Sequence, residues 1–417
     1  MTWSSLKRRV SRAVARGSRL PCLPKDFSNA RFERIRASQL IEEENLPDYL
    51  ATRYYPVRIG NVLASRYQVV GKLGYGATST VWMARDLLGH RHVALKIFIH
   101  SGSLGCDPSH ELSAYQRLDQ GPASHPGRQA VRALFNSFTI SGPDGAHQCL
   151  VHPPLWDSMQ TFLARNPIGR LPTPVLAITL KQVLLALDYA RQCGVIHTDI
   201  SASNIMFGIE DTAILEKFEQ AELENPTPRK EINGRIIYLS RELDIPTGSR
   251  FGLPVLCDFG SAAWGEEKHK KDAQPDVYRS PEVILKVPWS YEIDIWNVGC
   301  MIWDLFEGRH LFYGTDPEHG TYRGRAHLAE IISLLGPPPP GFAAQGALRS
   351  RFFSEQGEFQ AGIEVPPRVS LEQLETNLQG SDKALFLQFV SKMLQWDPKN
   401  RQKAKQLLED EWLKKHT

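Results

Sequence analysis

The stretch 195–207, VIHTDISASNIMF, combines residue types whose spacing suits phosphoryl transfer. Asp199 and Asn204 follow a long apolar helix pattern and lie five residues apart. A carboxylate can accept the proton of a hydroxyl group, and an amide oxygen can ligate magnesium. The same residues also occur in ordinary polar loops, so the stretch predicts chemistry only together with its neighbours along the chain.

Three more stretches carry suitable residues. Gly74 and Gly76 in KLGYG separate two strand patterns, where glycines let backbone N–H groups approach phosphates. Lys96 in VALK lies on an apolar strand, where a lysine is costly unless it is paired, and Glu111 on the next helix is a candidate partner. Asp258 opens the tripeptide DFG after another apolar strand. Taken singly, these stretches could be turns or a strand edge.

The order of the stretches decides between these alternatives. A glycine loop, VALK, a helix glutamate, D-x-x-x-x-N, DFG and SPE (280–282) follow one another as they do in protein kinases. Chance occurrence of the whole series is negligible. From Tyr67 to Leu413 the chain therefore resembles the eukaryotic protein kinases.

Hydrophobic periodicity agrees with that resemblance. Alternating patterns predict strands over 66–74, 79–86, 92–99, 129–140 and 147–155, with a short helix over 110–118. Helical spacing predicts helices over 173–194, 292–308, 383–394 and 402–413, with a break at 336–341. We therefore expect an α+β, bilobal protein kinase fold, with a small antiparallel β-rich N-lobe carrying one main helix and a larger helical C-lobe.

The predicted domain organisation has four parts. It comprises a basic, disordered arm or targeting segment at 1–40, a lead-in at 41–66, the N-lobe at 67–155, and the C-lobe at 156–413 with an insert at about 208–254.

Several details resemble the SR-protein kinase family, of the SRPK-like, fungal type. The lead-in 42–76 resembles that family's approach to the catalytic domain, Ser79 replaces the third glycine of the loop, and HTD replaces HRD. The insert between the catalytic loop and DFG is another such mark. The resemblance implies a serine/threonine protein kinase that uses ATP and Mg²⁺ and acts on protein substrates, with a link to the regulation of mRNA splicing.

The resemblance also implies residue roles. Asp199 would be the catalytic base, Lys96 would hold the ATP phosphates, and Asn204 and Asp258 would hold magnesium. The implied ATP-binding set is Leu73, Gly74, Gly76, Ser79, Val81, Ala94, Lys96, Glu111 and Leu155. Two further residues would be structural: Glu282 would pair with Arg401, and Asp294 would brace the catalytic loop.

Four departures from the usual kinase pattern affect the expected activity. Ser201 stands where a lysine would contact the transferred phosphoryl group, and Ser203 supplies no cation in its place. Thr198 replaces the arginine that would bind an activation-loop phosphate, so activity should not need that phosphate. His152 and Pro153 occupy the hinge, where the backbone N–H of Leu155 remains as a donor to adenine.

The fourth departure concerns the substrate-docking groove. The resemblance to the SR-protein kinases implies an acidic groove near residues 313–336 that binds arginine-rich substrates. Asp316 and Glu318 remain in the segment 313–336, but Arg323 and Arg325 add positive charge. Like charges repel, so these two arginines weaken the prediction that the substrate is rich in arginine and serine.

Composition adds little. The net charge is +3 over 417 residues, and the six scattered cysteines form no CxxC pair, which fits a reducing compartment. We expect a monomer without direct nucleic-acid or membrane binding. The acid-free, Arg- and Ser-rich residues 1–25 fit a disordered arm or nuclear patch, with cytoplasm and nucleus as location, or a mitochondrial transit peptide.

Two other functions compete with an active kinase. A pseudokinase scaffold would explain Ser201, but it would commonly have lost one of the five residues Lys96, Glu111, Asp199, Asn204 and Asp258. A phosphotransferase acting on non-protein acceptors would not be expected to keep the YRSPEVIL stretch at 278–285, which matches a peptide platform.

Overall fold

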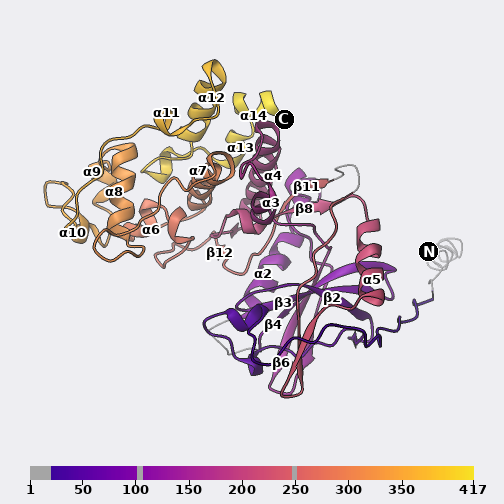
Figure 1. Ribbon diagram of the computed structural model, residues 1–417. Coiled ribbons are helices and arrows are strands. Elements are labelled where there is room, and N and C mark those ends of the chain that lie inside the picture. Colours follow the sequence, from indigo (N-terminus) through magenta and orange to yellow (C-terminus); the bar gives the residue numbers. More distant parts are fainter. Residues whose placement is uncertain (1–19, 101–106, 247–250) are drawn as a thin grey trace, which may run out of the picture. The chain divides into compact units, whose positions relative to one another are not determined.

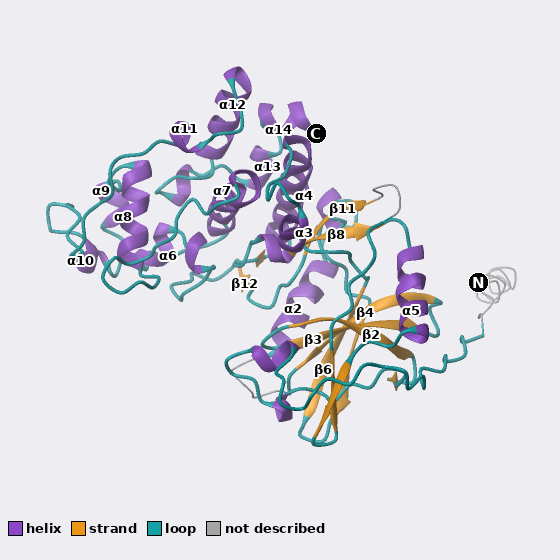
Figure 2. Cartoon of the chain, viewed as in Figure 1, coloured by secondary structure: helices purple, strands orange, loops and turns teal. Residues whose placement is uncertain are grey.

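The computed structural model describes residues 20–100, 107–246 and 251–417, and these form two compact units. Unit 1 combines the described parts of Met1–Cys106 with Phe135–Pro154 and Thr212–Asp244. Unit 2 combines Asp107–Leu134, Leu155–Asp211 and the described parts of Ile245–Thr417. Strands dominate unit 1 and helices dominate unit 2 (Figure 2), as expected for a bilobal kinase.

Unit 1 is built on a six-stranded antiparallel sheet in the order β1-β2-β3-β4-β6-β5 (Figure 1). The strands are β1 (Val62–Leu63), β2 (Tyr67–Tyr75), β3 (Ser79–Asp86), β4 (Arg91–Phe98), β5 (Asn136–Ser141) and β6 (Ala146–His152). Val93, Leu95 and Ile97 of β4 belong to a buried apolar cluster. Because side chains alternate along a strand, Ala94 and Lys96 lie on the opposite face of the sheet.

The insert is part of unit 1 rather than a loose loop. It contains α5 (Ala213–Glu224) and the hairpin β9 (Arg229–Ile232) and β10 (Arg235–Tyr238). Helix α5 lies beside β2 (Figure 1). A Cβ atom at Gly71 would lie 2.8 Å from the ring of Phe218, so this contact requires glycine. Tyr238 packs edge-on against Trp82 of the sheet.

The lead-in is fixed by buried ion pairs. Its acidic turn, η1 (Glu42–Asn45), is followed by η2 (Ala51–Arg53). Lys72 of β2 is fully buried and pairs with Glu43, and Lys230 of the insert pairs with Glu44 at 2.6 Å. The acidic turn therefore connects β2 to the insert hairpin.

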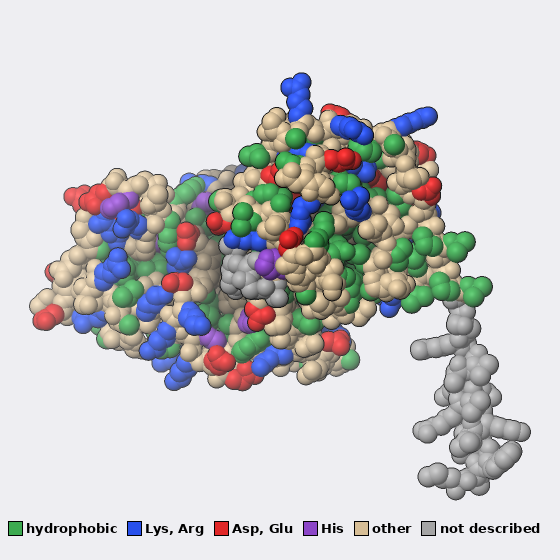
Figure 3. All heavy atoms as spheres, turned by 90° about the horizontal axis from the view of Figure 1, so that it is seen from below, with side chains coloured by type: hydrophobic (Ala, Val, Ile, Leu, Met, Phe, Trp, Pro, Cys, Tyr) green, Lys and Arg blue, Asp and Glu red, His purple; other side chains and the backbone are tan. Residues whose placement is uncertain are grey.

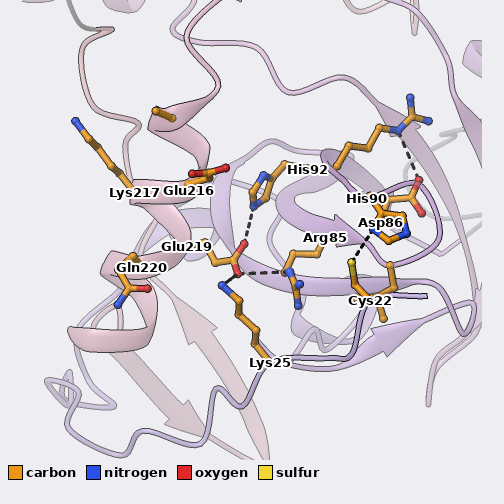
Figure 4. A pocket seen from close by; sticks show the side chains of 13 residues that line it. Cys22, Lys25, Arg85, Asp86, His90, His92, Glu216, Lys217, Glu219 and Gln220 are labelled. Carbon is orange, nitrogen blue, oxygen red and sulfur yellow. Dashed lines mark hydrogen bonds and ion pairs between the residues drawn. The ribbon is translucent and has the colours of Figure 1, made fainter. Parts of the chain in front are cut away.

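A cavity of about 740 Å³ opens in unit 1 between the segment before β1, the β3–β4 turn and α5 (Figure 4). Glu219 of α5 points between Lys25, Arg85 and His92, at 2.5, 3.4 and 2.6 Å (Figure 4). Burial alone would raise the pKa of Glu219, but hydrogen bonds from His92 and Lys25 outweigh it and lower the pKa to about 2. These pairs hold the amino-terminal segment against the insert helix.

Unit 2 is mainly helical. Its helices are α2 (Pro108–Asp119), η3 (Pro126–Arg128), α3 (Met159–Arg165), α4 (Thr173–Gln192), η4 (Ala202–Asn204), η6 (Asp276–Tyr278), α6 (Pro281–Leu285), α7 (Glu292–Glu307), α8 (Gly324–Leu335), α9 (Pro340–Ala343), α10 (Arg349–Phe352), α11 (Leu371–Leu374), α12 (Gly380–Ser391), η7 (Pro398–Asn400), α13 (Ala404–Leu407) and α14 (Glu411–His416). Two small sheets join β7 (Val195–Ile196) to β12 (Ala263–Trp264) and β8 (Ile205–Ile209) to β11 (Phe251–Leu256). Helix α7 is buried almost all round, as its sequence predicts.

Helix α4 is also long and apolar enough to cross a membrane by length and composition alone. That is weak support for a membrane span, because buried core helices pass the same test, and 56% of its most apolar window is buried.

The boundaries of the two units differ from the predicted lobe boundaries, which were 67–155 for the N-lobe and 156–413 for the C-lobe. Helix α2 groups with unit 2 because His110 bonds the carbonyl of Ala262 at 2.6 Å and Tyr115 packs on Phe259. The insert groups with unit 1 through α5 and its hairpin.

Three predicted elements are shorter or divided. The strand predicted over 129–140 begins only at Asn136, and the one predicted to reach 155 ends at His152. The helix predicted over 402–413 is two helices, because the side chain of Asp410 accepts the N–H of Trp412 and so caps a new start. Helix α9 begins at Pro340, within the predicted break at 336–341.

Candidate active site

The catalytic loop of unit 2 brings Asp199 and Asn204 together. The side-chain amide of Asn204 donates to the carbonyl and the Oδ2 atom of Asp199, each at 2.8 Å. Since the amide nitrogen of Asn204 faces Asp199, its oxygen is the atom left to ligate a cation. The turn η4 ends at Asn204, directly before β8, and these hydrogen bonds hold Asp199 beside it.

His197 fixes the conformation of the catalytic loop through both of its ring nitrogens. Its Nδ1 accepts the backbone N–H of Asp199 at 3.2 Å, so its Nε2 carries the proton and donates to the carbonyl of Cys257 at 3.0 Å. The N–H of Cys257 in turn donates to the carbonyl of Asn204 at 2.8 Å. The catalytic loop and the strand that leads to DFG are therefore held in register.

Asp294 of α7 braces the loop as predicted. It is almost fully buried, and its two carboxylate oxygens accept the backbone N–H groups of His197 and Thr198, each at 2.8 Å. Burial raises the pKa of Asp294 to about 6, against the opposing effects of His197 and of these hydrogen bonds. In its ionised form it satisfies two donors that would otherwise be buried without partners.

The DFG segment packs beside this loop. Asp258 has a backbone φ of 60°, in the left-handed region, and its Oδ1 accepts the N–H of Gly260 at 3.2 Å. Phe259 is fully buried between the rings of Tyr115 on α2 and His197, with centroids 5.5 and 4.7 Å away. Phe259 thus links α2 to the catalytic loop.

The surroundings of Asp199 raise the pKa of its carboxyl group, which suits a proton acceptor. Burial raises the pKa of the Asp199 carboxyl, and the charge of Asp258 acts in the same direction. The nearby His197 and the hydrogen bond from Asn204 oppose the rise. A carboxylate with a raised pKa is a stronger base, which favours its acceptance of a hydroxyl proton.

Unit 1 places three of the other predicted residues, Val81, Ala94 and Lys96, on one face of its sheet. Val81 pairs with Lys96 across β3 and β4, and Lys96 and Ala94 lie two apart on β4. Directly paired antiparallel residues point to the same side, so these three share the face opposite the apolar cluster. Leu73, Gly74, Gly76 and Ser79 lie in the β2–β3 hairpin next to Val81.

Glu111 lies on α2 of unit 2, close to the DFG glycine. It is 2% exposed, and a Cβ atom at Gly260 would lie 3.4 Å from its Oε2. Lys96 belongs to unit 1, so the pairing of Lys96 with Glu111 stays a prediction. Leu155 is the first residue of unit 2 after β6, and its bond to adenine is likewise a prediction.

The ion pair predicted between Glu282 and Arg401 is present. Both side chains are fully buried, and the guanidinium meets the carboxylate through two hydrogen bonds of 2.5 and 2.7 Å. Arg401 also donates to the carbonyl of Glu292 at 3.0 Å. The pair fixes α6, which carries the SPE sequence, against the helices that follow.

This chain is similar in sequence to known protein kinases. A protein kinase domain family model matches residues 247–413. A serine/threonine protein kinase of Aspergillus fumigatus is 42% identical over 395 residues, covering 94% of this chain and 96% of that protein. The serine/threonine-protein kinase SRPK of Physarum polycephalum is 30% identical, covering 89% of this chain and 91% of that protein. The chain belongs to the SRPK-type eukaryotic protein kinases.

Two more distant relatives agree with this family. SRSF protein kinase 3 of the mouse is 24% identical, covering 89% of this chain and 90% of that protein. A crystal structure of a kinase domain matches with a TM-score of 0.66 at 20% identity, covering 87% of this chain and 99% of that chain, and so shows the fold.

Within this SRPK-type kinase, Thr198 takes an unusual conformation. Its φ of 70° lies in the left-handed region, which is costly for a β-branched residue. Its hydroxyl donates to the carbonyl of Ser261, just after DFG, at 2.7 Å. A neutral hydrogen bond therefore ties the catalytic loop to the segment after DFG.

Ser201 remains the main departure in the catalytic loop of the kinase. Its hydroxyl lies 2.8 Å from the hydroxyl of Ser203. Neither serine provides a positive charge for a transferred phosphoryl group. The loop itself therefore offers hydrogen bonds where the usual pattern offers a cation.

The docking segment differs from the sequence prediction in one respect. Arg325 contacts Asp316 at 2.5 and 3.0 Å and Glu318 at 2.5 Å. Its charge is therefore neutralised within the segment and is not added to the surface as predicted. The same contacts occupy both acids, and the side chain of Asp316 is fully buried. This pairing joins residues nine apart, and no local sequence signal indicates it.

Proposed function

We propose that this chain transfers the γ-phosphate of ATP to serine or threonine hydroxyls of protein substrates. The observation that carries the proposal is the catalytic loop, in which Asn204 holds Asp199 through two hydrogen bonds and Asp294 fixes the backbone beneath them. Membership of the SRPK-type family supports the same activity.

Each residue has a role in the proposed reaction. Asp199 accepts the proton of the substrate hydroxyl. We propose that Lys96 holds the α- and β-phosphates, with Glu111 as its proposed partner. The set Leu73, Gly74, Gly76, Ser79, Val81, Ala94 and Leu155 binds the remainder of ATP.

The donor set fits magnesium. The amide oxygen of Asn204 and the carboxylate of Asp258 are hard oxygen ligands, the type that Mg²⁺ prefers. Magnesium, when bound, neutralises charge on the phosphates. The hydrogen bonds of Asn204 to Asp199 preset the amide orientation before any metal binds.

The proposal is tested by incubating the pure full chain with Mg–ATP and a neutral serine peptide, beside Asp199→Asn. We expect phosphate transfer by the wild type and a loss of about 10²–10⁴-fold in the variant, because general-base catalysis contributes on that scale. Transfer no faster than the variant would overturn the proposal.

Ser201 favours a second candidate, a pseudokinase scaffold that binds ATP or partners with little phosphotransfer. The two candidates separate in the same experiment if ATP binding is measured in parallel. Binding of Mg–ATP without transfer would favour the scaffold.

The cellular role is a further part of this proposal. The name of the relative SRSF protein kinase 3 states that it acts on SRSF proteins. We propose, from membership of the same family, that this chain is linked to the regulation of mRNA splicing. We propose a monomer in the cytoplasm and nucleus. The mitochondrial alternative rests on residues 1–25, of which 1–19 lie outside the described residues. Imaging of the full chain with a carboxyl-terminal fluorescent tag separates the two locations.

A further inference from the structure

A basic pocket lies in unit 2 beside the peptide platform. Its volume is about 460 Å³, and its lining includes Arg279, Lys286, Arg323, Arg325 and Arg351, with Asp272 as the acidic lining residue. Figure 3 shows Lys and Arg side chains gathered over this part of unit 2, around α6, α8 and α10. The pocket is therefore positively charged where the family resemblance predicts an acidic docking groove.

The cations of the basic pocket differ in how far they are neutralised. Arg279 pairs with Asp276 at 2.7 Å, Lys286 pairs with Asp272, and Arg325 pairs with Asp316 and Glu318. Arg323 and Arg351 are exposed, and within 20–100, 107–246 and 251–417 neither has a carboxylate within ion-pair distance. These two guanidinium groups are available to an incoming anion.

The acidic side chains at the basic pocket are already paired, and Asp272 of its lining pairs with Lys286. Arg325 occupies Asp316 and Glu318, and Asp316 is fully buried beneath it. At Gly324, a Cβ atom would lie 2.9 Å from the Cγ2 atom of Ile284, so a longer side chain there requires Ile284 to move. The pocket thus offers no free carboxylate to an arginine-rich peptide.

The basic pocket is continuous with the platform that carries SPE. Arg279 immediately precedes Ser280, Pro281 and Glu282, and Lys286 follows α6 directly. The α6 residue Ile284 and Phe352 of α10 add apolar surface to the lining. A peptide whose acceptor residue lies at the platform can place its neighbouring side chains in the pocket.

We propose that the basic pocket docks an anionic segment of the protein substrate, bearing carboxylates or phosphates, close to the acceptor residue. The inference rests on the proposed function and names its substrate class. Guanidinium groups bind both anions through paired hydrogen bonds. Arginine-rich segments, by contrast, meet like charge at Arg323 and Arg351 and are disfavoured.

The test measures peptide binding to the full chain without ATP, by fluorescence anisotropy. Three peptides share one neutral acceptor core and carry flanks of Asp and Glu, of phosphoserine, or of Arg and Ser. We expect at least one anionic peptide to bind about ten-fold or more tightly than the arginine peptide, with the difference shrinking as salt rises. Preference for the carboxylate or the phosphate flank identifies the anion.

Charge-reversal variants locate the binding. The double variant Arg323→Glu/Arg351→Glu should lose about ten-fold or more of the anionic peptide's affinity. The matched control Arg170→Glu reverses an exposed arginine of unit 2 outside the pocket and should change nothing. Because Arg323 and Arg351 are exposed, both proteins should keep the wild-type melting temperature. Equal binding of all three peptides, tighter binding of the arginine peptide, or equal loss in the control would overturn the proposal.

The same measurements separate this inference from the proposed function. Phosphorylation of the neutral peptide should be unchanged in the double variant. Binding of an anionic peptide with no phosphate transfer would retain the docking proposal and reject the kinase activity. Phosphate transfer with no preference among flanks would reject only the docking proposal.

Discussion

The catalytic loop and the docking segment of unit 2 each depend on one buried aspartate, and the two are satisfied differently. Asp294 accepts the backbone N–H groups of His197 and Thr198, whereas Asp316 accepts two backbone N–H groups of its own segment and is also paired with the side chain of Arg325. Backbone donors are present whatever the neighbouring side chains are. A side-chain partner can be gained or lost by one substitution, so the docking segment can change its charge while the catalytic loop keeps its geometry.

The largest expected effect concerns the buried ion pair next to the docking segment. Replacing Arg401 by Met leaves Glu282 charged and fully buried, and should cost about 3–5 kcal/mol of the free energy of unfolding. Replacing Arg325 by Met should cost less, about 1–3 kcal/mol, because Asp316 keeps the backbone N–H groups of Glu318 and His319. Urea unfolding of the full chain measures both. Equal costs would show that the backbone N–H groups at Asp316 do not compensate for the loss of its arginine partner.

The catalytic loop itself offers the next effect. Ser201→Lys should raise kcat by about a hundred- to a thousand-fold, since a charged contact to the transferred phosphoryl group is worth on the order of 2.5–4 kcal/mol. Ser201→Met has a similar length without charge and serves as the control, which should not gain. Steady-state assay with a neutral peptide measures the change. An unchanged rate in Ser201→Lys would show that another group already supplies the cation.

The buried carboxylate that braces the loop predicts a pH dependence of stability. The pKa of Asp294 is raised to about 6, so between about pH 4 and 6 the folded protein holds a proton that the unfolded chain has released. The free energy of unfolding should therefore fall by about 2–3 kcal/mol as pH rises through this window.

The matched variant isolates that contribution. Asp294→Asn has no group that titrates at this position. Its free energy of unfolding relative to the wild type should therefore improve as the pH rises through the same window. Glu372→Gln changes an exposed carboxylate and should run parallel to the wild type. Parallel curves for Asp294→Asn would contradict the prediction.

The smallest effect is expected at Thr198. Its hydroxyl ties the catalytic loop to Ser261 without any phosphate, so treatment of unphosphorylated protein with an activating kinase should change the rate by less than about twofold. Phosphate incorporation is measured beside activity. A large gain after incorporation would show that the neutral contact does not replace a phosphate-bound arginine.

The sequence was sufficient to locate the candidate catalytic loop because the residue types and their order are specific. Asp199, Asn204 and Asp258 lie in short motifs, and Glu282 with Arg401 followed from the same order along the chain. The strands and long helices were predicted from strong periodicity. Local signals therefore decided most of the site.

Long-range contacts account for what the sequence did not predict. The insert was expected only as an insert, although α5 and the β9–β10 hairpin belong to unit 1, because their partners lie far away in the chain. Arg325 was counted as free charge since its partner Asp316 is identified only by the fold. The continuous helix expected over 402–413 ends early because Asp410 caps a second helix.

Unit 1 is assembled from three separate stretches of chain, and this bears on how the protein is made. The lead-in needs Lys230 as the partner of Glu44, and the carbonyl of Tyr54 accepts a hydrogen bond from Arg235 at 2.6 Å. During synthesis from the amino terminus, neither contact can form until the hairpin at 229–238 has left the ribosome. Much of unit 2 upstream of that point has by then emerged as well. The smaller unit, although its sheet comes first in the chain, therefore cannot be completed before part of unit 2 has emerged.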